Sequence, residues 1–369
     1  MTPSPVRYGI IGSGMMGCEH IDDLAHIPDA VVVALADPVP SSLEEGARRV
    51  GRDVDTHVDH RALLARDDLD AVVIASPNFT HASILADAMA TDLAILVEKP
   101  LCTTIADCLD VRRRDADRDA ITWVGLEYRF IPAVSALLGQ LRSGAAGAIH
   151  MVSIREHRFP FLAKVGDWNR FTANTGGTLV EKCCHFFDLM RQIIGADPVR
   201  VYASGGQDVN HLDEVYDGRR ADMLDNAYVI VDFANGARGA LDLSMFAEGG
   251  RYEQEIAVVG DVAKVETTFP GDVVIIGPRD RSGPREVPAP ADVPYLGFHG
   301  GSSYIEHVRF IDCLRGGRQP EVTIDDGLWS VAMGVGAHRS IDEGRPVTME
   351  ELGLRPAASR PGGAVSRLI

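Results

Sequence analysis

The amino-acid sequence predicts an α/β fold built from two sheets of different kinds. Residues 1–127 alternate strand-like and helical segments, which is typical of a doubly wound, largely parallel sheet. Residues 128–348 carry strand-like runs joined by tight turns, which predicts an α+β domain with a large, mostly antiparallel open sheet. Residues 349–369 form a tail with little apolar content. A chain of 369 residues is long enough for two hydrophobic cores.

The composition, 46% hydrophobic and 24% charged, is ordinary for a soluble globular protein. The formal net charge of −17 and the lack of a Lys/Arg-rich run predict that neither nucleic acid nor an anionic membrane surface is a partner. The longest apolar runs, such as 30–36, have strand length, and no apolar signal segment precedes the first strand. Six scattered cysteines do not indicate a disulfide framework. We therefore expect a cytoplasmic protein with reduced thiols.

The N-terminal domain begins with a strand and continues in a regular strand–helix rhythm. The first strand, VRYGII, and the next, VVVALA, are short runs rich in apolar and β-branched residues. Each later strand is again a short apolar run that follows a helical segment. We expect strands at 6–11, 31–36, 71–75, 93–97 and 120–125, and helices at 18–27, 41–50, 60–66, 80–91 and 104–117.

The first strand leads into a glycine motif, G-x-G-x-x-G, at Gly12, Gly14 and Gly17. The first glycine permits a tight turn, the second lets the backbone approach a pyrophosphate, and the third lets helix and strand pack closely. The following helix N-terminus offers free N–H groups to phosphate, so Met15 and Met16 are expected to border the same ligand. The second strand ends at Asp37, where a carboxylate can bind a ribose diol and repel a 2′-phosphate. The motif therefore predicts a Rossmann domain that binds NAD in preference to NADP.

Other polar residues follow the later strands, where a doubly wound sheet binds its ligands. Ser76, Asn78 and His81 lie in the segment SPNFTH after the strand at 71–75, and Glu98 and Lys99 end the next one. We expect all five to contribute to the cofactor site. Turn chemistry alone is an equally good explanation of Asn78. A structural ion pair is a less favoured explanation of Lys99.

The second domain is predicted to begin with a helix and to continue as an antiparallel sheet. The segments ANGAR (234–238) and VGDVA (259–263) are typical of tight hairpin connections. Residues 278–298 are rich in Pro, Gly and charge, which predicts a long loop. We expect helices at 131–142, 302–315 and 326–343, and strands at 149–155, 199–204, 226–233, 238–245, 254–259 and 262–268.

The segment GGTLVEKCCHFFDL (176–189) combines an acid, two cysteines and a histidine. On a helix, its apolar residues fall on one broad face, and Glu181, His185 and Asp188 fall on a narrow stripe opposite. The adjacent Cys183 and Cys184 point about 100° apart, so both cannot join His185 at one metal ion. We therefore expect no metal site. The stripe is compatible with a solvated helix face or with a catalytic acid–histidine pair.

These motifs together resemble the Gfo/Idh/MocA oxidoreductases, the family of glucose–fructose oxidoreductase and inositol dehydrogenase. The resemblance rests on GIIGSGMMG, ADP, SPNFTHA, VEKP, GLEYRF-IP, GGTLVEKCCHFFDL and GSSYIEHVRFIDCLRGG, and so spans nearly the whole chain. It implies that Lys99 lies between nicotinamide and substrate, and that Glu98 lies near the nicotinamide ribose. It also implies that Glu181, His185 and Asp188 belong to the site, although the family usually has Asp where this chain has Glu181.

The resemblance implies oxidation or reduction of a secondary alcohol or ketone on a sugar, cyclitol or related polyol. We expect His185 to act as general base and Lys99 to stabilise the charge on the reacting oxygen. Glu181 is expected to orient the imidazole of His185. Lys99 and Glu181 are also expected to contact the substrate, as are His185 and Asp188.

Two further residues are candidates for the substrate site. Arg129 follows the last strand of the first domain, but an interdomain salt bridge explains it equally well. Trp168 precedes the glycine pair, where an aromatic ring can stack on a sugar or belong to the core. Tyr128 and His299 are weaker candidates.

The leading hypothesis is an NAD-dependent dehydrogenase of a small polyol. The alternatives are an NAD-dependent glycosidase that uses transient oxidation and a non-catalytic regulator that senses dinucleotides. The open sheet, together with the family resemblance, predicts a homodimer or homotetramer that assembles through the second domain.

Overall fold

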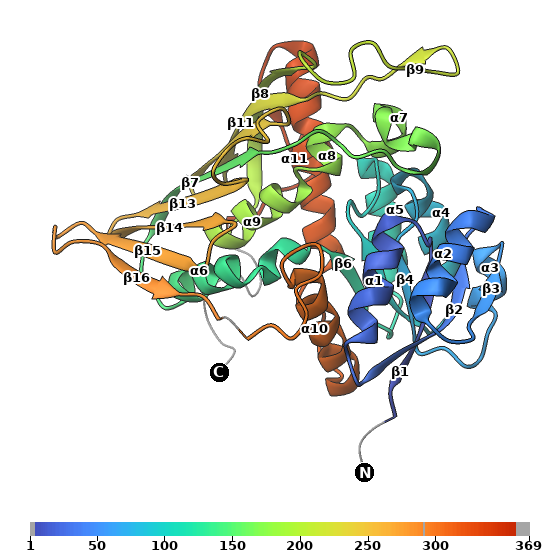
Figure 1. Ribbon diagram of the computed structural model, residues 1–369. Helices are drawn as coiled ribbons and strands as arrows, with labels where there is room; N and C mark the ends of the chain where they lie inside the picture. The colour runs from blue at the N-terminus through green and yellow to red at the C-terminus, as the bar shows by residue number, and fades with distance from the viewer. Residues whose placement is uncertain (1–3, 291, 359–369) are drawn as a thin grey trace.

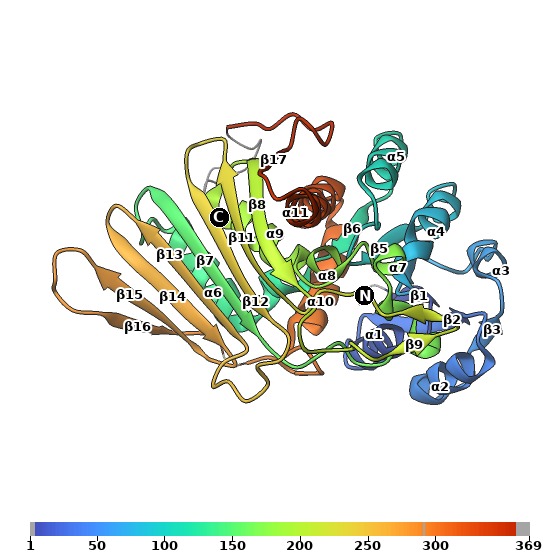
Figure 2. The same ribbon diagram turned by 90° about the horizontal axis from the view of Figure 1, so that it is seen from above.

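The computed structural model describes residues 4–290 and 292–358 and contains two main sheets. Of the expected tail, residues 359–369 lie outside the described part. Figures 1 and 2 show helices α10 (Ser302–Gly316) and α11 (Ile324–Glu343) between the two sheets. No helix in the described ranges is long and apolar enough to cross a membrane.

The N-terminal sheet has six parallel strands in the order β3-β2-β1-β4-β5-β6. Its inner strands are buried apolar runs, as their sequences predict. The polar strand β3 is an addition to the predicted elements, since its three residues join the edge by backbone pairing with β2. The strands are β1 (Val6–Ile11), β2 (Ala30–Ala36), β3 (Asp55–His57), β4 (Ala71–Ile74), β5 (Ala94–Glu98) and β6 (Thr122–Gly125).

Helices connect these strands and confirm the doubly wound fold class. The first begins at Met15 rather than at 18, because Gly14, in an extended conformation, serves as its N-cap. The helix after β5 is capped by Thr104, whose hydroxyl accepts from the Asp107 N–H. The helices are α1 (Met15–Ala25), α2 (Pro40–Val50), α3 (His60–Leu64), α4 (His81–Ala88) and α5 (Ile105–Asp115).

The second sheet is mostly antiparallel and has nine strands in the order β16-β15-β14-β13-β7-β12-β11-β8-β17. Only the pairing of β7 with β12 is parallel among the described strands of this sheet. Burial alternates along β11, so one face of the sheet is packed and the other is exposed. The strands are β7 (Ile149–His157), β8 (Pro198–Gly206), β11 (Asn226–Phe233), β12 (Arg238–Ser244), β13 (Gln254–Gly260), β14 (Ala263–Phe269), β15 (Val273–Pro278), β16 (Arg285–Pro288) and β17 (Val347–Thr348).

The long loop expected at 278–298 is partly wrong. A hairpin of β15 and β16 extends the sheet there, because the VVII run of β15 pairs with β14 and brings the polar β16 alongside. A small second hairpin, β9 (Val215–Tyr216) and β10 (Arg219–Arg220), was also not predicted. Both β10 and β16 are polar, and polar strands held mainly by backbone pairing give little hydrophobic signal.

The packed face of this sheet contacts helices α6 (Pro132–Arg142), α9 (Cys184–Ile194) and α11. Helix α11 begins with a capping box, in which Thr323 and Asp326 satisfy each other's backbone N–H groups. The short helices α7 (Thr172–Thr175) and α8 (Thr178–Glu181) precede α9, and the 3₁₀ turn η2 (Glu127–Phe130) follows β6. These turns bring the second domain against the carboxyl ends of the parallel strands.

Candidate active site

A groove of about 660 Å³ lies at the carboxyl ends of the parallel strands. The glycine loop forms one wall, with Gly12 at a φ of +92°, where a Cβ would lie 2.6 Å from the Ser76 nitrogen. A Cβ on Gly14 would meet nothing within 4 Å, so this backbone faces open space. A Cβ on Gly17 would lie 1.9 Å from the Gly12 carbonyl oxygen, which explains the close approach of helix and loop. The groove therefore fits the pyrophosphate of a dinucleotide.

Asp37 is held at the end of β2 by two backbone hydrogen bonds. The Ser13 N–H donates to one carboxylate oxygen at 2.8 Å, and the Val39 N–H donates to the other at 2.8 Å. The carboxylate borders the groove and keeps lone pairs for further donors. A ribose diol fits such an acceptor, whereas a 2′-phosphate would meet like charge.

Replacement of Asp37 by Ser is expected to reduce the preference for NAD over NADP by about 10- to 100-fold, the loss for a hydrogen bond to a charged group. The reason is that the ribose diol loses its acceptor and the 2′-phosphate loses a repelling charge. Steady-state kcat/KM with each cofactor measures the ratio. Asp53→Ser is the matched control, because it removes an exposed carboxylate that does not line the groove. An unchanged ratio in Asp37→Ser would show that another residue selects the cofactor.

Most of the other expected cofactor residues line this groove, namely Met15, Met16, Ser76, Asn78, Glu98 and Lys99. His81 does not, because its ring nitrogens lie 2.8 Å from the Pro100 carbonyl and 3.0 Å from the Ser76 carbonyl. It ties together the two loops that carry Asn78 and Lys99. Gly17 likewise acts through packing and not by lining the groove.

Glu98 is buried beside a pair of histidines. Its carboxylate lies 3.0 Å from His20 Nε2, and His20 Nδ1 lies 2.8 Å from His307 Nε2 of α10. Burial alone would raise the pKa of Glu98, but the bond to His20 outweighs it and lowers the pKa. Glu98 therefore stays ionised at the groove.

A second, smaller cavity of about 90 Å³ lies where the second domain meets the groove. Lys99 and His185 both line it. The Lys99 ammonium donates to the Glu181 backbone carbonyl at 3.3 Å. Burial disfavours that charge, but nearby acidic groups, Glu181 foremost, outweigh burial and raise the pKa of Lys99. Lys99 is consequently cationic at neutral pH.

His185 has the opposite electrostatic character. Its ring stacks on Tyr128, with centroids 4.0 Å apart and planes 10° apart, and its Nε2 lies 3.6 Å from Glu127 Oε1. Burial, followed by the positive charges of Lys99 and Lys182, lowers the pKa of His185 well below its usual value. The imidazole is therefore neutral at physiological pH and able to accept a proton.

The single helix expected over this segment is wrong, because α8 ends at Glu181 and α9 begins at Cys184. The Glu181 carboxylate binds the Asn78 amide and Lys164, 3.4 Å away, and the expected contact with His185 is absent from the described residues. The solvated-face alternative is also wrong, since Glu181, His185 and Asp188 are 3%, 2% and 1% exposed. The acid next to His185 is Glu127, from the other side of the cavity.

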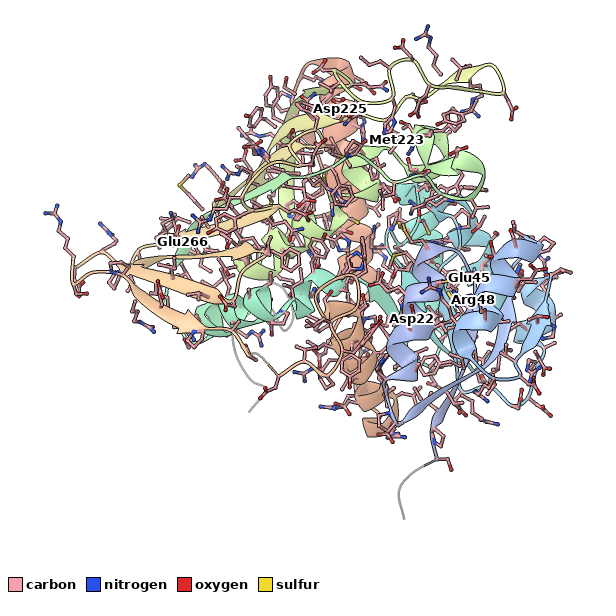
Figure 3. The ribbon with its side chains drawn as sticks, in the orientation of Figure 1. Asp22, Glu45, Arg48, Met223, Asp225 and Glu266 are labelled. Carbon is pink, nitrogen blue, oxygen red and sulfur yellow. The ribbon has the colours of Figure 1, made fainter. Side chains whose placement is uncertain are left out.

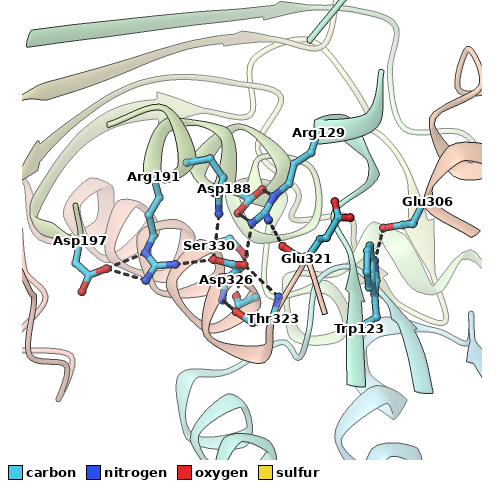
Figure 4. A network of polar contacts seen from close by, with 12 residues as sticks. Trp123, Arg129, Asp188, Arg191, Asp197, Glu306, Glu321, Thr323, Asp326 and Ser330 are labelled. Carbon is cyan, nitrogen blue, oxygen red and sulfur yellow. Dashed lines mark hydrogen bonds and ion pairs between the residues drawn. The ribbon is translucent and has the colours of Figure 1, made fainter. Parts of the chain in front are cut away.

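Arg129 and Asp188 line neither cavity, so the geometry does not support their expected substrate contacts, which stay predictions. The Arg129 guanidinium donates to both oxygens of Asp188, at 2.6 and 2.5 Å, and lies 3.0 Å from Asp326. Arg191 joins Asp326 to Asp197 in the same buried network, which Figure 4 shows across α9 and the start of α11. A buried salt bridge, the alternative explanation of Arg129, is therefore the one found, but its partners Asp188 and Asp326 lie within the same 128–348 domain as Arg129.

Replacement of Arg129 by Met is expected to lower the free energy of unfolding by about 3–5 kcal/mol, because the buried Asp188 loses its bidentate partner. Urea unfolding monitored by circular dichroism measures the change. Arg200→Met, which removes an exposed pair with Asp232, should cost less than about 1 kcal/mol. A loss of kcat/KM in Arg129→Met without loss of stability would instead favour a direct substrate contact.

Trp168 borders the cofactor groove and not the smaller cavity. The Lys164 ammonium lies 4.7 Å from its ring centroid, and Phe79 meets it edge to face. The ring therefore helps to position Lys164 at the mouth of the groove.

The sequence did not single out several residues that line the smaller cavity, including Glu127, Arg158 and Lys164. His299, a weaker candidate, lines it too and lies 2.7 Å from Glu19 of α1. Glu127 lies in the GLEYRF segment, directly before the candidates Tyr128 and Arg129. Arg158 and Lys164 lie in a connecting segment without a motif, so nothing in the local sequence marked them.

A glycine loop, an acid at the end of the second strand, and a lysine and histidine at the domain junction define an NAD-binding oxidoreductase. Comparison with protein families agrees with this class. Residues 6–126 match the model described as "Oxidoreductase family, NAD-binding Rossmann fold", and residues 139–349 match "Oxidoreductase family, C-terminal alpha/beta domain". The chain therefore belongs to the Gfo/Idh/MocA oxidoreductase family.

Individual relatives are similar over almost their whole length. Myo-inositol 2-dehydrogenase of Thermotoga maritima is 29% identical over 94% of this chain and 99% of its own. Inositol 2-dehydrogenase of Rhizobium meliloti is 29% identical over 93% of this chain and 99% of its own. The crystal structure of a probable dehydrogenase from Thermotoga maritima aligns with 94% of this chain and 99% of its own, with 28% identity and a TM-score of 0.76. Levoglucosan dehydrogenase in complex with NADH aligns with 94% of this chain and 99% of its own; it is 23% identical and has the same fold, with a TM-score of 0.83.

Proposed function

We propose that this enzyme oxidises a secondary hydroxyl of a sugar, sugar derivative or cyclitol with NAD, and reduces the corresponding ketone in reverse. One observation carries the proposal. A lysine whose pKa is raised and a histidine whose pKa is lowered line one cavity, and the same lysine also lines the cofactor groove. The inositol dehydrogenases among the relatives support this substrate class.

The opposite pKa shifts suggest separate roles for the two residues. Lys99 remains cationic, so it holds the hydroxyl oxygen and stabilises the negative charge that develops there. His185 is neutral, so it takes the hydroxyl proton, and it returns a proton in the reductive direction. NAD, held by the glycine loop and Asp37, supplies the chemistry of hydride acceptance. The stacking of His185 on Tyr128 fixes the plane of the imidazole.

Glu181 has a different role from the one expected from sequence. Its carboxylate faces Asn78 and Lys164 and favours the charged form of Lys99. We therefore assign Glu181 to the charge of Lys99 and not to the orientation of His185. Glu127 is the acid that faces His185. Its pKa is raised to about 7, first by burial and then by the negative charge of Glu98.

The test is an assay of NADH absorbance with NAD and a panel of inositols, aldoses and sugar acids. A sustained, substrate-dependent rise is expected with at least one member. A glycosidase that oxidises its substrate transiently would release sugar without net NADH. A regulator would bind NAD and turn over none of the compounds, and that result would contradict the proposal.

The exposed face of the nine-stranded sheet supports assembly into a homodimer or homotetramer. Apolar side chains gather there on neighbouring strands, among them Met151, Tyr202, Tyr228, Ile230 and Val259. The strand register pairs Ile230 with Tyr202 and Val259 with Met151, so each pair projects from the same face. Light scattering after gel filtration should give the oligomer mass, and Ile230→Arg should shift the protein toward monomer. A monomeric parent protein would contradict this assembly.

A cytoplasmic location is part of the same proposal. All six cysteines are buried and unpaired, as a reducing compartment favours. Fractionation of the source cells should recover the protein with the cytoplasmic fraction, and recovery outside the cytoplasm would contradict the location.

A further inference from the structure

The smaller cavity gathers positive charge in a chain whose formal net charge is −17. The chain has four lysines, and three of them, Lys99, Lys164 and Lys182, line this cavity. The fourth, Lys264, lies on β14 of the sheet. Arg158 lines the cavity as well, so three lysines and one arginine surround a space of about 90 Å³. Burial lowers the pKa of Lys182, and its pairing with Glu156 only partly offsets that effect.

Two carboxylates are shared among these four cations. Glu156, fully buried, lies 3.0 Å from the Lys182 ammonium and 3.7 Å from Arg158. Glu181 lies 3.4 Å from Lys164 and also faces the charge of Lys99. Each carboxylate therefore serves two cations. Glu98, ionised at the cofactor groove, adds a third negative charge near Lys99, so the four basic side chains still outnumber the ionised carboxylates around them.

The remaining acids on the cavity wall do little to cancel this excess. Burial and Glu98 raise the pKa of Glu127 to about 7, so at neutral pH only part of it is ionised. Glu19 is already paired with His299 at 2.7 Å. Burial would lower the pKa of His299, but the bond to Glu19 outweighs burial and raises it. An oxidised nicotinamide is itself cationic, so its presence would add to the positive charge.

Arg158 is the cation whose guanidinium still has a free hydrogen-bond donor among the contacts of the described residues. Its Nη1 lies 3.7 Å from Glu156, and its Nε donates to the Phe159 carbonyl at 3.3 Å. The guanidinium lies 4.2 Å from the centroid of the Phe159 ring, and the side chain is 16% exposed. Its Nη2 has no hydrogen-bond partner among the described residues. A guanidinium held by stacking, with an unused edge at a cavity, suits a carboxylate.

We propose that the substrate carries a carboxylate, so that the enzyme acts on a sugar acid such as a uronate and not on a neutral polyol. Arg158 binds the carboxylate, with Lys164 beside it, while Lys99 and His185 hold the hydroxyl that reacts. This inference rests on the function proposed above. The reaction itself is unchanged: a hydride leaves the carbon for NAD, and the hydroxyl proton goes to His185.

Stabilisation of the reacting oxygen alone does not explain the arrangement. Lys99 already supplies a cation at that oxygen, and one such charge is enough for a neutral substrate. Lys182 is accounted for by its contacts with Glu156 and the Tyr128 hydroxyl, at 3.0 and 2.7 Å. Arg158 is not required by either role. Lys164 pairs with Glu181 and also lines the cofactor groove, so it can assist at the carboxylate only from the border of the two cavities. Both residues come from the segment that follows β7.

The test compares binding of matched acids and neutral sugars to the enzyme–NADH complex by calorimetry. The pairs are D-glucuronate with D-glucose and D-galacturonate with D-galactose, with myo-inositol as a neutral cyclitol. The better acid is expected to bind about 10-fold or more tightly than its parent sugar, as a charge-assisted contact provides. Arg158→Gln should remove most of that difference and Arg158→Lys should restore part of it. Arg113→Gln, an exposed arginine on α5, should leave it unchanged.

Equal or tighter binding of the neutral compounds would overturn the inference, as would a full preference for acids in Arg158→Gln. Failure of every acid to bind would also count against it. NADH formation with the same panel separates the two proposals. Turnover of neutral compounds alone would overturn the sugar-acid inference and leave the dehydrogenase function standing. Binding of acids without turnover of any compound would contradict the dehydrogenase function.

Discussion

Lys99→Met is expected to lower kcat/KM about 10²- to 10³-fold, the usual cost of losing one group that stabilises a developing oxyanion. In the proposed reaction the Lys99 ammonium, which faces Glu181, stabilises the charge on the hydroxyl oxygen, and methionine gives a side chain of similar length without the charge. Initial rates of NADH formation measure the loss. NADH binding, followed by fluorescence, should change little, because the glycine loop and Asp37 hold the rest of the cofactor.

Lys264→Met is the matched control for this change. Lys264 pairs with Glu266 on the exposed surface of β14, and Figure 3 shows Glu266 far from α1 and α2, which carry Asp22 and Glu45. It should retain the parent kcat/KM. Normal turnover in Lys99→Met would show that Lys99 is a structural ion-pair residue.

His185→Gln is expected to lower kcat about 10²- to 10⁴-fold, the range for loss of a general base. The glutamine can still fill the space beside Tyr128, but it cannot accept a proton at neutral pH. His150→Gln, an exposed histidine on β7, is the control and should behave as the parent.

The pH profile distinguishes a base from a residue that only packs. A base must be neutral, and burial together with Lys99 and Lys182 lowers the pKa of His185. Activity in the oxidative direction should therefore fall, as the pH decreases, only below about pH 6.5, the ordinary histidine value. This acid limb should disappear from the residual activity of His185→Gln. An unchanged acid limb in the variant would assign the limb to another group.

The cofactor half of the site could be predicted closely from sequence. Gly12, Gly14 and Asp37 belong to one continuous strand–helix–strand unit, in which local geometry places the glycine loop and the acid on the same groove. Lys99 could be located for a related reason, because the carboxyl ends of parallel strands meet at one edge. His81 and Gly17 lie near this edge, but they contact neighbouring backbone and do not line the groove.

The substrate half was predicted less well. Helical spacing placed Glu181 beside His185, but the helix is interrupted at 182–183, and Glu181 turns to Asn78 and Lys164. Arg129 and Asp188 were placed near substrate, yet each is neutralised inside a buried network of the second domain. These outcomes depend on which charges meet when separate elements pack together, and spacing within one segment contains no information on that.

The sequence by itself determined the two-sheet fold and the dinucleotide loop with Asp37 beside it, and the family resemblance predicted that Lys99 and His185 come together. Only the tertiary structure decided that Glu127 faces His185, that Arg129 and Asp188 neutralise each other, and that three of the four lysines line one cavity. The physical reason is the range of the interactions. Turns and hydrophobic periodicity act between near neighbours in the chain. Buried charges take their partners from any element packed against them, so their pairing is fixed only when the domains meet.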